Sequence, residues 1–328
     1  MKRTMKKMVS MALTGTMAVA VLAGAGTSEV KAADKAKIGV LVADVSGEEA
    51  QGFRSYYENY IAGNYDVEFN YTDALQSAED EKTAIEKFAS QGCQAIISFS
   101  SNDRVQQIET CEKYGVYYAV ASGVLDDAQY ETYKTYEYFA GQVGPGNDTE
   151  FEAGKDMGAY YKEQGVSKVA IYGAFIPNPM HVYRVAGVLN GLGCTYGGES
   201  DMNAIAGQIF QDQTVDLSKV EGDVEVVSYL QGYGDTTTDE LNAAIQKTPD
   251  AFISVGMATT FFAQSLSEAG ISFSDIDSFT ETNGNSMKNG TLTYLAGKYS
   301  SSIGPVFALV MNAINGNVIR DEDGNAPS

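Results

Sequence analysis

The sequence is poor in histidine and in basic residues, and each shortage excludes a class of function. His181 is the only histidine among 328 residues, so a metal site built from several histidines is excluded. A Ser-His-acid triad would have this one residue as its only possible base. Lys and Arg total 22 against 43 Asp and Glu, for a net charge of −21. A surface this acidic repels phosphate backbones, so we expect no nucleic-acid partner.

Cysteine is also scarce. Cys93, Cys111 and Cys194 are an odd number, so at most one internal disulfide can form. Cys93 falls at the start of an expected strand and Cys111 at the end of the antiparallel helix that follows, which makes a bridge between them sterically possible. We favour the alternative, in which both are small buried residues.

Motifs for catalysis and for cofactor binding are missing. The sequence has no G-x-x-x-x-G-K-[ST] loop, no G-x-G-x-x-G after a strand and no G-x-S-x-G elbow. Residues 321–324 (DEDG) begin like a calcium loop but lack its spacing and its distant Glu, so we expect a solvated acidic turn. Carboxylates are plentiful, and spacing selects no acid–base pair. We therefore expect neither an enzyme nor a bound cofactor or metal.

The first 33 residues have the pattern of a secretory signal peptide. A basic start is followed by a mostly apolar run over residues 9–25, which is shorter and weaker than a membrane-spanning helix. Val30-Lys31-Ala32 fits the small-residue cleavage pattern. Residues 22–25 (LAGA) resemble a lipoprotein signal with Ala25 in place of the essential cysteine, so no lipid can be attached there. These features predict a soluble extracytoplasmic protein.

Apolar runs and helical patterns alternate along the rest of the chain. Residues 37–45 (KIGVLVADV) are a continuous apolar run, typical of a strand buried on both faces of a parallel sheet. The helix that follows the next strand begins at Ser77 with a pattern that resembles a capping box. In this first half we expect strands at residues 66–73, 94–99, 116–121 and 138–143.

The same alternation restarts after Gly144-Pro145-Gly146, a natural break. We expect strands at 168–174, 224–230, 251–255 and 276–280, and helices at 149–163, 181–192, 238–247 and 259–269. Residues 194–222 show weak periodicity and are predicted to be an irregular insertion. Strands separated by helices predict an α/β protein with two halves, each built on a parallel sheet.

The order of these features resembles the type 1 periplasmic-binding-protein family, the solute receptors of ABC importers. The resemblance runs from about residue 37 to 317 and rests on several blocks rather than on one motif. They are IGVLVADV, AIEKFASQGCQAIISFSSND, KYGVYYAVASG, GPGND, VAIYGAF, YRVAGVLNGLG, PDAFISVGMATTFFAQSLSEAGI, NGTLTYLAG and IGPVFALVMNAINGN. The leader peptide occupies the space where the cytoplasmic LacI-type repressors of this fold carry a helix-turn-helix.

The resemblance implies two Rossmann-like lobes joined by three hinge crossovers, with the ligand held between them. Residues 34–143 and 296–328 would form the N-terminal lobe, and residues 144–295 the C-terminal lobe. The chain is expected to return to the first lobe after about Thr291. Family members usually add one or two strands after the last helix, so we expect the sequence to be truncated at Ser328. The implied partners of this monomer are a small-molecule ligand and an ABC permease in the membrane.

Ligands of open parallel sheets bind beyond the carboxyl ends of the strands, so we take the residues just after strands as candidates. Arg184 resembles the cleft arginine of the family's R-x-x-G, and Tyr233 is the best aromatic platform for a ring. The expected ligand-binding residues are Asp44, Phe53, Phe99, Ser100, Asn102, Ser122, His181, Arg184, Tyr229, Tyr233, Asp235, Met257, Glu281, Asn283 and Lys298.

Three positions depart from the family pattern. Ser122 stands where sugar-binding relatives often have Asp or Arg, Gly256-Met257 where they often have Asn-Asp, and Thr280 where Asp is common. Each buried hydroxyl left unpaired costs about 1–3 kcal/mol, so these losses weaken the case for a simple hexose. We expect a solute-binding protein for a small polar ligand, with sugars as the leading class. The alternative is a secreted ligand-sensing module that serves a chemoreceptor or a histidine kinase.

Overall fold

The computed structural model describes residues 35–232 and 234–328, and it leaves the side chain of Asp235 undescribed. The signal peptide expected over residues 1–33 lies outside the described residues. Residues Lys35–Ser328 form one compact unit. Within this described part of the chain, no helix is both long enough and apolar enough to cross a bilayer.

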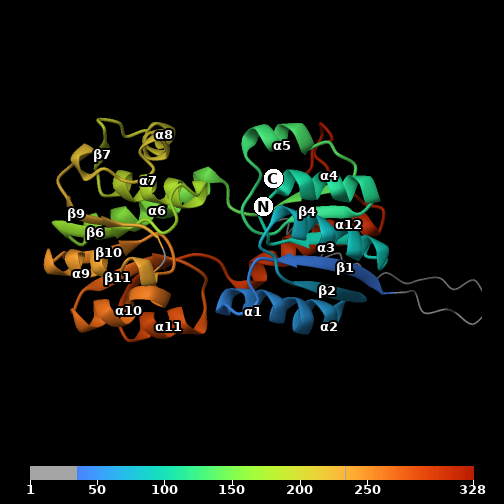
Figure 1. The fold of residues 1–328 in the computed structure, drawn as a ribbon, viewed down its shortest axis with the longest axis horizontal. Coiled ribbons are helices and arrows are strands. Elements are labelled where there is room, and N and C mark those ends of the chain that lie inside the picture. The colour runs from blue at the N-terminus through green and yellow to red at the C-terminus, as the bar shows by residue number, and fades with distance from the viewer. Residues whose placement is uncertain (1–34, 233) are drawn as a thin grey trace, which may run out of the picture. The chain divides into compact units, whose positions relative to one another are not determined.

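Two five-stranded sheets, parallel throughout, organise the chain (Figure 1), and they confirm the predicted α/β class. Sheet A has the order β2 (Val67–Ala74), β1 (Ala36–Val42), β3 (Ala95–Ser98), β4 (Tyr117–Val120), β5 (Phe139–Gln142). Sheet B has the order β12 (Leu292–Ala296), β11 (Ser272–Ile276), β10 (Ala251–Ser254), β6 (Lys168–Tyr172), β9 (Glu225–Leu230). We call sheet A with its helices the N-terminal lobe, and sheet B with its helices the C-terminal lobe.

Helices connect the strands in both lobes. Those of the first half are α1 (Glu48–Ser55), a π-helical turn η1 (Tyr56–Ile61), α2 (Ala62–Asn64), α3 (Ala78–Ser90), α4 (Arg104–Tyr114) and α5 (Asp127–Tyr133). The second half has α6 (Asn147–Glu163), α7 (Pro179–Gly191), α8 (Met202–Asp212), α9 (Thr238–Gln246), α10 (Ala258–Glu268), α11 (Glu281–Lys288) and α12 (Gly304–Ile314). The 3₁₀ turns are η2 (Leu217–Lys219), η3 (Gly234–Thr236) and η4 (Ser300–Ile303).

Sheet A is covered on both faces, which explains why its strands read as continuous apolar runs. Phe53 and Tyr57 from the first helical segment and Val306 from α12 pack against one face. Ile85 of α3 and Ile108 of α4 pack against the other. The expected cap of α3 is confirmed, because the Ser77 hydroxyl accepts a hydrogen bond from the Asp80 amide at 3.2 Å. Sheet B and its helices enclose one larger core.

The structure corrects the sequence prediction in two segments of the C-terminal lobe. The strand expected at 276–280 lies earlier, at Ser272–Ile276. Asp275 can lie inside this strand because its buried carboxylate accepts hydrogen bonds from the Ser254 hydroxyl and the Thr259 amide. The segment 194–222, expected to be irregular, contains α8 and a short antiparallel pair, β7 (Thr195–Tyr196) with β8 (Val220–Glu221). Only three residues of α8 are buried, and this narrow apolar face explains the weak periodicity.

The described chain passes between the two sheets twice, and not three times as the family resemblance implied. The first passage follows β5 through residues 143–146. The second follows β12, which extends sheet B to Ala296, beyond the return expected after Thr291. From there η4 and α12 lead back to sheet A. The lobe boundaries at 143/144 and 295/296 stay a prediction.

The C-terminal segment covers the free edge of sheet A. The Gln142 amide of β5 donates to the Pro327 carbonyl at 2.9 Å, and the Arg320 guanidinium donates to the Phe139 carbonyl at 2.8 Å. Residues 321–324 are exposed, as expected for a solvated acidic turn. The segment therefore satisfies backbone groups that an edge strand would otherwise leave open to pairing with another chain.

The three cysteines are free and buried, which confirms the favoured alternative over a Cys93–Cys111 bridge. Burial raises the pKa of each thiol, to about 11 for Cys93. Thiolate is the reactive form of cysteine, so these side chains act as packing residues.

The first passage between the sheets needs glycine at one position and tolerates a side chain two residues later. A Cβ on Gly144 would overlap the backbone of Gly123, whereas a Cβ on Gly146 meets nothing within 4 Å. We expect Gly144→Ala to lower the free energy of unfolding by about 2 kcal/mol or more, since neither backbone can yield cheaply. The matched Gly146→Ala should change it by about 0.5 kcal/mol at most. Urea titration of both variants measures the difference, and equal values would contradict the steric argument.

Candidate functional site

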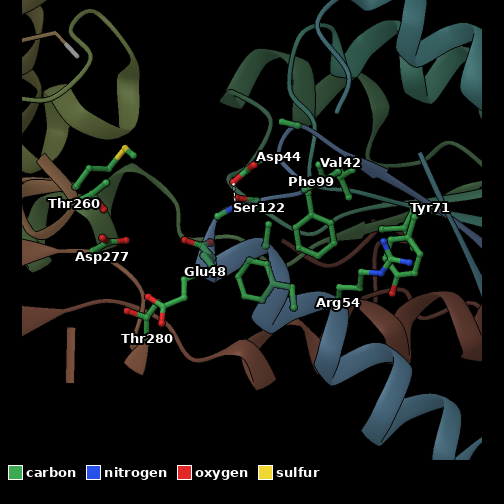
Figure 2. A pocket seen from close by; sticks show the side chains of 18 of the residues that line it. Val42, Asp44, Glu48, Arg54, Tyr71, Phe99, Ser122, Thr260, Asp277 and Thr280 are labelled. Atoms are coloured by element: carbon green, nitrogen blue, oxygen red, sulfur yellow. Dashed lines mark hydrogen bonds between the residues drawn. The ribbon is translucent and has the colours of Figure 1, made fainter. Parts of the chain in front are cut away.

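A cavity of about 440 Å³ lies beyond the carboxyl ends of both sheets, with residues from both lobes in its lining. The N-terminal lobe contributes the loop after β1, the first turns of α1, the end of β2 and Phe99 after β3. The C-terminal lobe contributes Met257 and Thr259 after β10 and Asp277 after β11. Figure 2 shows Asp44, Phe99 and Tyr71 on one side and Thr260, Asp277 and Thr280 on the other.

Aromatic rings form the wall on the N-terminal lobe. Phe53 and Phe99 stack with centroids 5.3 Å apart, and Tyr57 meets Phe99 edge-on at 6.4 Å. At the far end the Arg54 guanidinium lies over the Tyr71 ring at 4.5 Å (Figure 2) and pairs with Glu58 at 2.9 Å. Stacked rings of this kind offer a flat apolar face to a ligand.

Carboxylates surround this wall. The Asp44 oxygens accept hydrogen bonds from the Ser46 and Gly47 amides, both at 2.9 Å, and these bonds lower the pKa of Asp44. Glu48 stands in the first turn of α1, and its Oε1 accepts a 3.4 Å hydrogen bond from the Thr282 amide of α11. Glu48 of the N-terminal lobe therefore contacts α11 of the C-terminal lobe.

Lys298, in the second passage between the sheets, joins several cavity elements. Its ammonium pairs with Glu49 at 2.9 Å and lies 5.2 Å from the centroid of the Phe53 ring. It also donates to the Ser122 hydroxyl at 3.5 Å. A residue of the passage thus contacts two separate segments of the N-terminal lobe.

The C-terminal side of the cavity carries an acidic group and a hydroxyl. Asp277 is the first residue after β11; burial raises its pKa, and the neighbouring charge of Glu49 acts in the same direction. Thr259 is 8% exposed, and its hydroxyl has no hydrogen-bond partner among the described residues. Met257 has a φ of 67°, a left-handed conformation that costs a non-glycine residue about 1–3 kcal/mol.

The structure brings some of the expected ligand-binding residues to the cavity. The lining residues among them are Asp44, Phe53, Phe99, Ser122, Met257 and Asn283. Glu281 and Lys298 line a smaller depression next to it, which shares Phe53, Glu48 and Glu49 with the main cavity. Contact with a ligand stays a prediction for all of these side chains.

Ser100 and Asn102 are engaged elsewhere. The fully buried Glu81 carboxylate of α3 accepts hydrogen bonds from the Ser100 hydroxyl and from the amides of Asn102 and Asp103, at 2.9 and 3.0 Å for the amides. Burial acts to raise the pKa of Glu81, but the hydrogen bonds outweigh it and lower the value. These two expected site residues are thereby used to fix the loop after β3.

His181 and Arg184 of α7 also lie outside the cavity lining. Arg184 pairs with the buried Glu150 of α6 at 2.5 Å and donates to the carbonyls of Val255 and Ile276 at 2.9 and 3.3 Å. The Arg184 guanidinium therefore connects the ends of β10 and β11 to α6 and α7. His181 is buried, and its Nδ1 accepts a hydrogen bond from the Phe175 amide at 3.3 Å.

The remaining expected residues follow β9. The Tyr229 hydroxyl is buried, has no hydrogen-bond partner among the described residues, and lies against Gly173 rather than in the cavity lining. Tyr233 lies outside the described residues, as does the side chain of Asp235.

Several lining residues were missed from the sequence, and two of them left a usable signal. Asp277 directly follows β11. Because the strand was predicted at 276–280, Asp277 fell inside it and was not considered among the residues that follow a strand. Glu49 stands one helical turn before Phe53, so it faces the same side of the segment. The other missed lining residues are Val40, Val42, Ala43, Val45, Gly47, Glu48, Ala50, Arg54, Tyr57, Tyr71, Thr72, Thr259, Thr260, Thr280 and Thr282.

The acidic groups are too dispersed for a metal site. Nowhere in residues 35–232 and 234–328 do three or more His, Cys, Asp or Glu side chains come together in a way that could hold a metal ion. The arrangement is suited to an organic ligand that meets a flat apolar wall and separate polar groups.

No family model and no curated protein matches the sequence, but solved structures do. An ABC-transporter periplasmic solute-binding protein from Actinobacillus succinogenes with bound D-allose is 16% identical, with a TM-score of 0.68, over 89% of this chain and 94% of that one. The periplasmic component of an arabinose ABC transporter from Shewanella is 15% identical, with a TM-score of 0.62, over 89% of both chains. The Escherichia coli transcriptional repressor ascG is 12% identical, with a TM-score of 0.59, over 90% and 95%.

These similarities show that the fold is the two-lobed type 1 periplasmic-binding-protein fold expected from the sequence. Sugar-binding proteins of ABC transporters and transcription regulators both share it.

Two buried groups of the C-terminal lobe, His181 and Asp275, should give opposite pH dependences of stability. Burial lowers the pKa of His181 to about 4, so its contribution to folding is lost as pH falls from 6.5 towards 4. Burial raises the pKa of Asp275 to about 7, so its contribution is lost as pH rises from 3.8 towards 7. The two effects oppose each other in the intact protein.

Urea unfolding at about pH 5 and about pH 8 separates these contributions. Relative to wild type, the stability at the higher pH minus that at the lower should decrease in His181→Gln and increase in Asp275→Asn. Each change should be on the order of 2 kcal/mol. The double difference cancels any packing loss common to both pH values, and shifts of the same sign in the two variants would contradict the assignment.

Proposed function

We propose that the protein is the extracytoplasmic solute-binding component of an ABC importer, which captures a small polar ligand between its two lobes. The observation that carries this proposal is the cavity at the carboxyl ends of both sheets, lined from both lobes. In this arrangement a ligand contacts both lobes at once. It therefore binds the closed form more tightly than the open one and shifts the population towards closure.

Sugars are the leading ligand class. The structurally similar proteins with bound D-allose, L-arabinofuranose and myo-inositol support this choice. A volume of about 440 Å³ suits a ligand the size of a monosaccharide or a nucleoside, and the stacked Phe53–Phe99 pair could pack against the apolar face of a ring.

The leader-like residues 1–33 support export, after which the mature monomer would deliver its ligand to a permease in the membrane. The protein performs no chemistry in this proposal. The similar proteins named above are binding proteins and regulators of transcription, which agrees with a role in binding.

Isothermal titration of the protein with monosaccharides, polyols, nucleosides and amino acids tests the proposal. We expect at least one class to bind with a dissociation constant below about 1 mM, as capture of a dilute solute by a preformed site requires. If no member of the panel binds in this range, the proposal fails.

A substitution in the aromatic wall tests whether binding occurs in this cavity. Phe99→Leu keeps an apolar side chain and removes the stack on Phe53, so the affinity for the best ligand of the panel should fall about 3- to 10-fold. Tyr60→Leu is the matched control, because Tyr60 is 58% exposed and lies outside the cavity lining. Equal affinities of the two variants for that ligand would place the binding site elsewhere.

A further inference from the structure

The charges around the cavity do not balance. Five charged residues line it: Asp44, Glu48, Glu49, Asp277 and Arg54. Arg54 is paired with Glu58 and Glu49 with Lys298, both at 2.9 Å. Among the described residues, Asp44, Glu48 and Asp277 have no basic partner within ion-pair distance. Three carboxylates therefore face the cavity without a counter-ion.

These three groups reach the cavity from both lobes. Asp44 and Glu48 belong to the loop after β1 and to α1, whereas Asp277 follows β11. Figure 2 shows Asp44 and Glu48 on one side of the gap and Asp277 on the other. When the lobes enclose a neutral solute, its hydroxyls can donate hydrogen bonds to these carboxylates, but it brings no positive charge to replace the lost hydration, which is costly.

The neighbouring groups also favour a cation. The stacked Phe53 and Phe99 rings line the cavity, and the face of an aromatic ring attracts a positive charge through its quadrupole. The Lys298 ammonium makes a contact of this kind, 5.2 Å from the centroid of the Phe53 ring. The aromatic wall and the three acidic groups therefore both favour a positively charged ligand.

A polar group without a partner completes the site. Thr259 lines the cavity and is 8% exposed, and its hydroxyl has no hydrogen-bond partner among the described residues. A buried hydroxyl of this kind is usually satisfied by something, and a ligand hydroxyl or amine in the cavity could do so. The side chain points to a hydroxylated ligand independently of the charges.

From these contacts we infer that the solute of this cavity carries a protonated amine, so that an amino sugar or a similar hydroxylated amine binds in preference to its neutral parent. The inference rests on the proposed function, because it assigns a charge to the solute captured there. A free divalent metal is a poor alternative, since the described acidic groups are not placed to surround one ion. An anionic solute would meet three acidic groups that have no basic partner within ion-pair distance among the described residues.

Matched sets of solutes test the sign of the charge. Titration calorimetry compares D-glucosamine with D-glucose and N-acetyl-D-glucosamine, and D-galactosamine with D-galactose and N-acetyl-D-galactosamine, because acetylation removes the charge. We expect each amine that binds to do so at least about 10-fold more tightly than both uncharged members of its set, because a hydrogen bond to a charged group contributes at least this much to the affinity.

If a neutral solute of these sets or of the wider panel binds as tightly as the amines, the inference is wrong while the proposed function stands. If nothing binds, both fail.

Two charge-removing variants, one in each lobe, test the residues. Glu48→Gln and Asp277→Asn should each weaken amine binding about 10- to 100-fold and leave the binding of neutral solutes within about 3-fold of wild type. Glu163→Gln is the matched control, because it removes the same charge from an exposed position at the end of α6, outside the cavity. Equal losses for amines and neutral solutes would indicate a general packing role and would overturn the assignment.

Discussion

Loops at the carboxyl ends of parallel strands carry backbone groups that no sheet can satisfy, and in this protein buried charged side chains take that role. Glu81 holds the loop after β3, and Arg184, paired with Glu150, holds the ends of β10 and β11. Because these anchors are buried and hydrogen-bonded, the loops they fix can present other residues to the cavity in a constant position. The candidate site depends on this arrangement in both lobes.

The same anchors explain which parts of the site could be predicted from the sequence. The rule that selects residues after strands depends only on strand direction, and some of the residues that it selects, such as Asp44 and Ser122, line the cavity. It cannot tell a residue that faces a ligand from one that holds a loop. Asp44 lines the cavity, whereas Ser100 is bound to Glu81, 19 positions earlier in the sequence, and no spacing reveals that partner.

The fold was easier to predict because it follows from periodicity. Continuous apolar runs such as residues 37–45 reflect strands covered on both faces, and this cause is local to the run. The prediction failed where tertiary partners override the pattern. Asp275 lies inside a strand because Ser254 and the Thr259 amide satisfy its carboxylate, and α8 forms on an apolar face of only three residues.

The state of the cysteines has a practical consequence for following lobe movement by fluorescence. All three thiols are buried with raised pKa values, so maleimide dyes should react with them slowly in the folded protein. A single new cysteine on an exposed position near the cavity rim, such as Thr260→Cys, would therefore be labelled selectively without first removing the native ones. The packing of these cysteines thus makes the protein suitable for a one-dye optical test of the ligand binding proposed above.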